Sequence, residues 1–256
     1  MKIFISLLKA DLNRALLSLN FVLSTLFIML VMFISCSGFI TGTSDVVYLL
    51  GHALSGSGST MFILCIAPIL PYGMSFASDM EDKVMTFWII RTGVKKYAAS
   101  KFVVSVIGGF LTVGIGIFVF ILIMSLFFPL FISVNTGDSY ASLLRNNKTG
   151  LYILLIAVHY SLSAALFAGT AIAVSSFIPN KFTVLSAPIV IYFVLMRLTT
   201  YASIPNFLKA DLLVQSIYPD VSPIAAFLYK LIPVAGILGI LLFVTIKQIN
   251  KKVETS

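Results

Sequence analysis

The sequence predicts an all-α polytopic membrane protein, and three observations support that fold class. First, 59% of the 256 residues are hydrophobic and only 10% are charged, whereas a soluble globular domain carries about 25% charged residues. Second, the mean hydropathy of the chain is +1.08. Third, the apolar residues gather into runs of about 20, the length at which a helix crosses the hydrocarbon core of a bilayer. We therefore expect one transmembrane domain over residues 1–256.

Residues 1–15 predict an amphipathic helix that lies in the interface between membrane and cytosol. A polar stripe recurs at helical spacing: Lys2, Ser6, Lys9 and Asn13. Asp11 interrupts the opposite, apolar side, and Arg14 follows at a spacing that allows the two to pair. Two interpretations stay open: a simple surface anchor, or a helix on which Asp11 and Arg14 face protein, such as a cytosolic partner.

Six apolar runs predict transmembrane helices. They cover residues 16–40, 61–76, 102–127, 151–178, 182–200 and 224–246. The second run is short and holds Pro68 and Pro71, so we expect a kink, because neighbouring helices can satisfy the backbone groups that a proline frees. The Gly- and Ser-rich residues 41–59 and the polar residues 129–150 are expected to be connecting segments.

A charged stretch links the second and third spans. Residues 78–101 hold eight charged side chains and the chain's only tryptophan, Trp88. The order Ser78-Asp79-Met80-Glu81 fits a helix capping box. Arg91 and Gly93 suit the last turn and the stop of a helix. The stretch therefore predicts a separately capped cytoplasmic helix over residues 79–92.

The middle of this predicted helix is too apolar to remain in water. It holds Val84, Met85, Phe87, Trp88, Ile89 and Ile90. The membrane surface is one burial site, since tryptophan and lysine favour that interface. A groove on a soluble partner is the other, with Trp88 and Phe87 as anchors. The residues alone leave both open.

Polar residues inside spans are costly and therefore point to function or to specific packing. Candidates for a substrate cavity are Asn20, Ser24, His159, Tyr160 and Arg197. His159 suits either hydrogen-bonded packing or a proton relay. Arg197 suits either an interface anchor or contact with an anionic group. Small residues such as Gly109, Gly116 and Gly169 predict helix-packing faces, or alternatively a dimer or substrate surface.

Residues 202–223 are too apolar for an ordinary loop, and three prolines prevent them from spanning the membrane. We expect an external re-entrant or interfacial segment that acts as a gate.

The basic residues set the orientation, because cytoplasmic loops are rich in Lys and Arg. With the N-terminus inside, twelve of the 17 basic residues are cytoplasmic, so both termini are expected in the cytoplasm. This asymmetry also accounts for the net charge of +8, and no nucleic-acid partner is expected.

The acidic residue, short apolar helix, basic break and lysine at the start of the third span resemble the ABC transporter type 2 permease family. The match rests on Glu81 with its acidic neighbours, residues 86–89, Arg91 and Lys101. The family's usual proline before the basic residues is absent, and Thr92-Gly93 takes its place. The interfacial start, six spans, cytoplasmic termini and residues 202–223 agree with the family in outline.

The resemblance implies a permease domain in the cytoplasmic membrane of a bacterium, with a coupling helix over residues 79–92 that docks on a separate ATPase. The implied contact residues are Glu81, Asp82, Lys83, Thr86, Phe87, Trp88 and Arg91, joined by Asp11 and Arg14. This chain has no G-x-x-x-x-G-K-[ST] phosphate loop, so ATP and Mg would bind to the separate ATPase, which the resemblance implies is present in two copies. This chain is expected to be non-catalytic and without cofactor or metal. Six spans would form half a pore, so a second permease chain, identical or homologous, is expected.

The expected function is ATP-driven export of a hydrophobic or amphipathic substrate such as a peptide, a bacteriocin or a drug. The alternatives are an ion-coupled secondary carrier and a membrane partner that transports nothing. A membrane enzyme is disfavoured, because the chain has only two histidines, no G-x-S-x-G motif and no carboxylate pair within the predicted spans.

Overall fold

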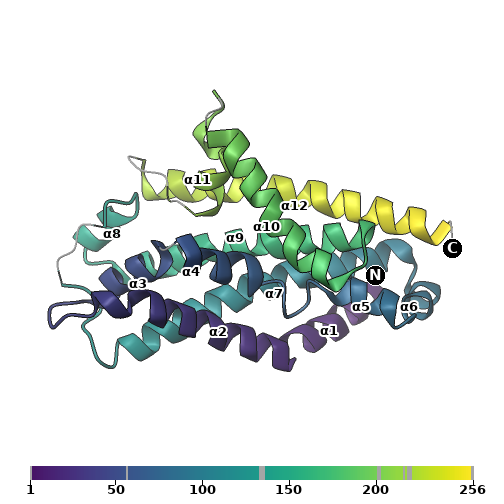
Figure 1. Ribbon diagram of the computed structural model, residues 1–256, viewed down its shortest axis with the longest axis horizontal. Helices are drawn as coiled ribbons and strands as arrows, with labels where there is room; N and C mark the ends of the chain where they lie inside the picture. The colour runs from purple at the N-terminus through teal and green to yellow at the C-terminus, as the bar shows by residue number, and fades with distance from the viewer. Residues whose placement is uncertain are drawn as a thin grey trace.

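The computed structural model describes residues 2–55, 57–132, 136–200, 203–215, 217 and 221–254. All the regular secondary structure within these residues is helical, with no strand. Most of the protein's long helices run side by side along the longest axis of the molecule, and the helix over Lys181–Thr200 crosses them obliquely (Figure 1). Five are long and apolar enough to cross a membrane, and a bent pair makes a sixth candidate. The predicted fold class, an all-α polytopic membrane protein, is confirmed.

The five continuous candidate spans agree with five of the predicted runs. They are α2 (Leu19–Cys36), α7 (Val94–Met124), α9 (Thr149–Phe177), α10 (Lys181–Thr200) and α12 (Pro223–Glu254). A short 3-10 turn, η1 (Ser37–Phe39), continues α2. The first helix, α1 (Lys2–Leu16), is separate from α2 because Ser18 starts a new helix. The hydroxyl of Ser18 accepts a hydrogen bond from the amide of Phe21, and this bond caps the start of α2.

The predicted second span, residues 61–76, is wrong in its bounds. Residues expected to be a loop instead form α3 (Val46–Ser55), followed by α4 (Ser57–Met61) and the π-helix η2 (Phe62–Ile66). The pieces 46–55 and 58–66 meet at 80°. The apolar side of α3 is buried against the other helices. The many glycines and serines of residues 41–59 made this segment resemble a loop in the sequence. It is helical because a helix buries the apolar face of α3 against the bundle.

The chain turns through Pro68 and Pro71 before α5 (Ser75–Glu81) and α6 (Met85–Thr92). Short helical elements also connect the later spans: α8 (Ala141–Arg145), η3 (Asn206–Leu208) and α11 (Ala210–Val214). The last two belong to the predicted re-entrant segment 202–223, of which residues 202, 216 and 218–220 lie outside the described part. Its role as an external gate stays a prediction.

Helix α9 lies at the centre of the bundle, with 72% of its most apolar window buried, and packs against α7, α12 and α10. Small residues allow the close approach. A Cβ atom added to Gly109 would lie 2.6 Å from the Cβ atom of Ala168, and one added to Gly169 would lie 2.7 Å from Leu238. Gly116 meets Ile28 of α2 in the same way. Of the two interpretations of these glycines, packing within the chain is the one observed.

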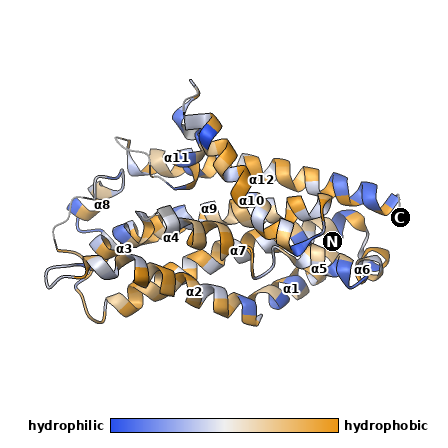
Figure 2. Cartoon of the chain, viewed as in Figure 1, coloured by the Kyte–Doolittle hydropathy of each residue, from blue (hydrophilic) through white to orange (hydrophobic). Residues whose placement is uncertain are grey.

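The two ends of the molecule differ in character. We call the end that holds both described termini, α5 and α6 the terminal end, and the end that holds α8 and the start of α3 the distal end (Figure 1). Hydrophobic residues fill the middle of the long helices, and hydrophilic residues gather at α6 and in the last turns of α12 (Figure 2). The apolar middle therefore lies between two more polar ends, as a membrane-spanning bundle requires.

Gly109 tests the packing of α7 against α9, and the neighbouring Gly108 supplies the control. A methyl group at Gly109 would force Ala168 aside, and overpacking of this kind costs about 1–3 kcal/mol. A Cβ atom at Gly108 meets nothing within 4 Å, and replacing a helical glycine by alanine stabilises by about 0.5–1 kcal/mol. We expect Gly109→Ala to unfold at a lower temperature than the wild type, and Gly108→Ala at the same or a higher one, for the purified chain in one detergent. Equal unfolding temperatures for the two variants would contradict this packing.

Candidate functional site

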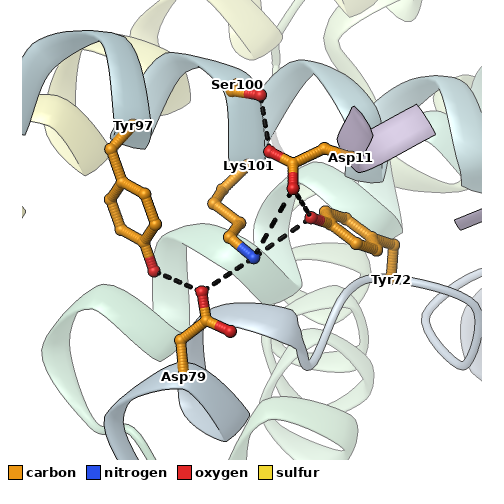
Figure 3. Close-up of polar contacts among 6 residues, drawn as sticks. All are labelled: Asp11, Tyr72, Asp79, Tyr97, Ser100 and Lys101. Atoms are coloured by element: carbon orange, nitrogen blue, oxygen red, sulfur yellow. Dashed lines mark hydrogen bonds and ion pairs between the residues drawn. The ribbon is translucent and has the colours of Figure 1, made fainter. Parts of the chain in front are cut away.

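A buried group of polar side chains lies at the terminal end and joins four segments of the chain. We call it the terminal cluster (Figure 3); its members are Asp11 of α1, Tyr72 in the turn before α5, Asp79 of α5, and Tyr97, Ser100 and Lys101 of α7. No member is more than 7% exposed. Burying charged groups is costly unless they are paired and hydrogen-bonded, so the contacts within the cluster decide whether this end of the molecule is stable.

Lys101 is the centre of the terminal cluster. Its Nζ lies 2.8 Å from Oδ2 of Asp79 and 4.0 Å from Oδ1 of Asp11, and it donates a hydrogen bond of 3.0 Å to the hydroxyl of Tyr72. The ammonium also lies 4.9 Å from the ring centre of Tyr72 and 5.6 Å from that of Tyr97, within the range of cation–π attraction. Carboxylates and aromatic rings thus replace the water that the ammonium loses.

Hydroxyl groups complete the coordination of both carboxylates. Tyr72 donates to Oδ1 of Asp11 at 2.6 Å, and Ser100 donates to its Oδ2 at 2.7 Å. Tyr97 donates to Oδ2 of Asp79 at 2.7 Å. The cluster holds two acidic residues and one basic residue, and these three hydroxyl donors supply the hydrogen bonds that one lysine cannot. Such a fully bonded network fixes the relative positions of α1, α5 and α7.

The predicted role of Asp11 in partner binding is wrong. Asp11 does face protein, but that protein is the chain itself, and its ionic partner is Lys101 rather than Arg14. The physical reason is that α1 packs against α7, so the apolar side from which Asp11 projects is covered by helix instead of lipid. Arg14 is exposed.

The predicted continuous helix over residues 79–92 is also wrong, because it is two helices. Helix α5 ends at Glu81, Lys83 adopts a left-handed conformation with φ of 57°, and α6 begins at Met85. The capping box is not formed, since Ser78 lies within α5, whose N-cap residue is Met74. Asp79 is bound inside the terminal cluster and is not a solvated first-turn residue. The predicted stop at Gly93 is confirmed, with φ of 82°.

Helix α6 exposes two large apolar side chains. Phe87 is 74% exposed and Ile90 is 80% exposed. Trp88 points the other way and packs, half-buried, against the apolar group that includes Phe76, Met85 and Tyr97. The two predicted anchors are therefore on different sides: Phe87 faces outward, whereas Trp88 fixes α6 to the bundle.

The remaining predicted contact residues surround the exposed face of α6. Those that are exposed are Asp82, Lys83, Thr86 and Arg91. Glu81 is also exposed, and its Oε2 forms an ion pair of 2.7 Å with Nζ of Lys181 at the start of α10. Surface ion pairs of this kind contribute little stability, but this one connects the end of α5 to the start of α10.

The five residues predicted to form a substrate cavity do not come together. A cavity of about 540 Å³ lies at the distal end, and of the five only Tyr160 lines it. Asn20 and Arg197 are exposed, and Ser24 is buried within α2. They lie apart because α2 and α10 pack on different sides of the bundle, a separation that linear order does not reveal.

His159 is fully buried next to the distal cavity. Its Nδ1 lies 3.2 Å from the hydroxyl of Tyr140, and its ring contacts the rings of Tyr140 and Tyr160 edge-on. Burial, assisted by the nearby charge of Asp138, raises the pKa of Tyr140 well above its ordinary value, so the hydroxyl keeps its proton. Of the two interpretations of His159, hydrogen-bonded packing is the one that these contacts support.

Sequence reasoning missed a second buried cation, Lys230 of α12. Its Nζ donates to the hydroxyl of Ser163 at 2.7 Å and to the backbone carbonyl of Leu213, and lies 3.5 Å from the carbonyl oxygen of Val214. Helix α12 is thereby attached to α9 and to the end of α11. In the sequence, the one indication that Lys230 is buried is its position as the seventh residue of the predicted sixth span. Nothing in the sequence indicated that the tyrosines of the terminal cluster are buried together.

Comparison with known proteins yields no match: no family model, no curated protein and no solved structure is significantly similar to this chain. The protein is a helical, polytopic membrane protein with five or six candidate spans.

Lys101→Met tests whether the terminal cluster holds this end of the molecule together. Removing the ammonium leaves two buried carboxylates, and breaking a buried ion pair in this way costs about 3–5 kcal/mol. We expect an unfolding temperature well below that of the wild type, whereas Lys96→Met, at an exposed position of the same helix, leaves it unchanged. The triple variant Asp11→Asn/Asp79→Asn/Lys101→Met removes all three charges and should regain part of the loss. Unchanged stability of Lys101→Met would show that the ion pairs do not hold the cluster together.

Proposed function

We propose that this chain is the membrane-spanning, non-catalytic subunit of an ATP-driven exporter of the ABC type 2 kind, and that a separate ATPase docks on α6. The observation that carries the proposal is the exposed apolar face of α6 at the terminal end, formed by Phe87 and Ile90. Side chains three residues apart lie on one helix face, and a helix that presents such a pair suits a groove on a partner protein.

The depth of α6 favours a protein partner over the membrane interior. Met85, Trp88 and Ile89 belong to the same apolar group as Ile249 of α12. That part of α12 carries Lys247, Lys251 and Lys252, and in Figure 2 hydrophilic residues mark the same region. Because charged helix ends lie outside the hydrocarbon core, α6 is expected at the level of water and headgroups. Exposed Phe87 and Ile90 there require a cover, and an ATPase in the cytosol would supply it.

The terminal cluster provides a route by which docking on α6 would affect the spans. Trp88 packs against the apolar group around Tyr97, and Tyr97 is bonded to Asp79. Lys101 connects the same carboxylate to Tyr72 and Asp11. A displacement of α6 would therefore act on α1, α5 and α7 as one unit. In the proposed mechanism, two ATPase copies bind ATP and Mg, approach each other, and move these helices between inward-open and outward-open arrangements.

The proposal includes a second permease chain, identical or homologous. Helices α10 and α12 have only 17% and 11% of their most apolar windows buried within the chain, so lipid or a second copy must cover the rest. The substrate class we propose is hydrophobic or amphipathic, such as a peptide, a bacteriocin or a drug, because the spans offer mostly apolar surface. The orientation that fits the basic residues puts both termini in the cytoplasm of a bacterium.

The terminal cluster favours one competing function, an ion-coupled carrier, because such carriers bind protons or cations at buried carboxylates. Asp11 and Asp79 are such carboxylates, but they belong to α1 and α5, outside the candidate spans. Reconstituted vesicles separate the two functions. Uptake driven by a proton or sodium gradient without ATP would support the carrier, and uptake that requires ATP and a second protein would support the exporter.

The double variant Phe87→Ser/Ile90→Ser tests the docking face directly. An apolar anchor at the centre of an interface is worth about 2 kcal/mol or more. When the tagged variant is purified from its native membrane, we expect at least about tenfold less ATPase to co-purify with it than with the wild type. Coupled ATP hydrolysis should fall by a similar factor. Trp88→Ala and Glu81→Lys should also abolish coupled turnover without preventing membrane insertion, but both disturb contacts within the chain, so they are less specific.

Leu17→Ser is the matched control, since Leu17 is 82% exposed but lies at the junction of α1 and α2. It should leave ATPase retention and hydrolysis at the wild-type level. The ATPase is identified by a phosphate-binding loop in its own sequence and by nucleotide hydrolysis of the purified complex. Wild-type retention by the Phe87→Ser/Ile90→Ser variant would refute docking on α6.

Trp88 offers an independent measurement, because it is the only tryptophan of the chain. Its fluorescence is recorded in vesicles whose acyl chains carry bromine, which quenches tryptophan on contact. We expect weak quenching in the assembled complex, because Trp88 packs toward the bundle and the outward side of α6 contacts the ATPase rather than lipid. Strong quenching that persists with the ATPase bound would mean that α6 lies in the membrane, and it would overturn the proposal.

A further inference from the structure

The distal cavity holds one acidic side chain within a wall of aromatic, aliphatic and uncharged polar side chains. It is lined by α3 and α4, by residues 136–138, by the first turns of α9, and by Gln215 and Ile217. Its volume of about 540 Å³ is in the range of cavities that bind drug-sized ligands. Among the described lining residues Asp138 is the only one that is acidic, and none is Lys or Arg.

We propose that the distal cavity binds a hydrophobic organic cation, an amine, guanidinium or quaternary ammonium group attached to an apolar body. The site is the cavity formed by Asp138, the tyrosines of α3 and α9, and the aliphatic residues between them. It lies at the opposite end of the molecule from α6 (Figure 1). The proposal does not depend on ATP-driven transport, since it concerns binding by this chain alone.

Asp138 is held in place by the chain but keeps acceptor capacity. Its Oδ1 accepts a hydrogen bond of 2.7 Å from the amide of Tyr140, and its Oδ2 accepts one of 2.8 Å from the hydroxyl of Tyr152. A carboxylate has about four lone-pair positions, so these two bonds orient the group without saturating it. A cation in the cavity would find a preorganised counter-charge.

The rest of the wall suits the body of such a ligand. Tyr152, Ile156 and Tyr160 recur every four residues and form one face of α9 toward the cavity. Across from them, α3 contributes Tyr48 and His52, whose rings lie edge-on with centres 4.4 Å apart. Aromatic faces attract organic cations, with a larger effect where water is excluded. Aliphatic side chains from α3 complete the apolar part: Val47, Leu50 and Leu54.

Two other ligand classes fit less well. An anion would meet Asp138 and no Lys or Arg among the described lining residues. A metal ion would need several ligands, but no three His, Cys, Asp or Glu side chains gather anywhere in the described part of the chain. A single carboxylate surrounded by rings is instead the arrangement that recognises a weakly hydrated organic cation.

Tetraphenylphosphonium and tetraphenylborate test the proposal, because they have the same shape and opposite charge. Binding of each to the purified full chain in detergent is measured by equilibrium dialysis. We expect the cation to bind and the anion to bind at least tenfold more weakly. Asp138→Asn should weaken cation binding at least tenfold, which corresponds to about 1.4 kcal/mol. Asp211→Asn, at an acid in α11 that does not line the cavity, should leave it unchanged.

A second variant keeps the test sharp if Asp138→Asn disturbs the fold. Gly51 lies on α3, lines the cavity, and would place a Cβ atom in open space. Gly51→Phe fills the cavity without changing charge and replaces a residue that disfavours helix. It should abolish cation binding, whereas Gly239→Phe on α12, also open, should not. Equal binding of both ions, or cation binding that survives both Asp138→Asn and Gly51→Phe, would overturn the proposal.

Discussion

The ion pair between Lys101 and Asp79 is the contact on which the terminal end of this protein depends. Lys101 lies where α7 enters the bundle and is only 2% exposed. An ammonium that loses its water must be paired and hydrogen-bonded, and Asp79 at 2.8 Å, Tyr72 and Asp11 meet that requirement. Helix α5 packs against α9, and the side chain of Asp79 reaches Lys101 and Tyr97 of α7; Lys83, with φ of 57°, then separates α5 from α6. The break between α5 and α6 therefore comes directly after the segment whose Asp79 neutralises the lysine.

Away from the terminal cluster, close contact between backbones holds the bundle together. Lipid offers helices no hydrophobic reason to associate, so packing and hydrogen bonds must hold them. Gly109 and Gly169 let α7 and α12 approach α9, and Lys230 attaches α12 to Ser163 and to α11. Helices α10 and α12 otherwise remain largely uncovered. The chain therefore has a well-packed centre around α9 and an outer surface that requires lipid or another protein.

Each end of the bundle carries one feature that is out of place for its surroundings. At the terminal end, Phe87 and Ile90 expose apolar surface among charged residues. At the distal end, Asp138 introduces a charge into a wall of tyrosines, aliphatic and uncharged polar side chains. The exposed pair on α6 is not needed to pack the helices, since α6 is fixed through Trp88, and the two hydrogen bonds of Asp138 leave part of its acceptor capacity unused. Features that exceed what the fold requires are where binding is to be sought.

The sequence by itself determined the fold class, five of the candidate spans, and the amphipathic start, because apolar runs of sufficient length have one stable arrangement in a bilayer. It also identified the stop at Gly93 and the glycines at which helices meet, since both follow from the missing side chain. Only the tertiary structure decided that residues 46–55 are helical, that Asp79 and Asp11 are internal, and that Phe87 and Trp88 face opposite ways. These outcomes depend on which side chain of one segment meets which of another, as Asp11 meets Lys101 across 90 positions of chain. Local periodicity contains no such information, because the free energy of a buried charge is set by partners that are distant in sequence.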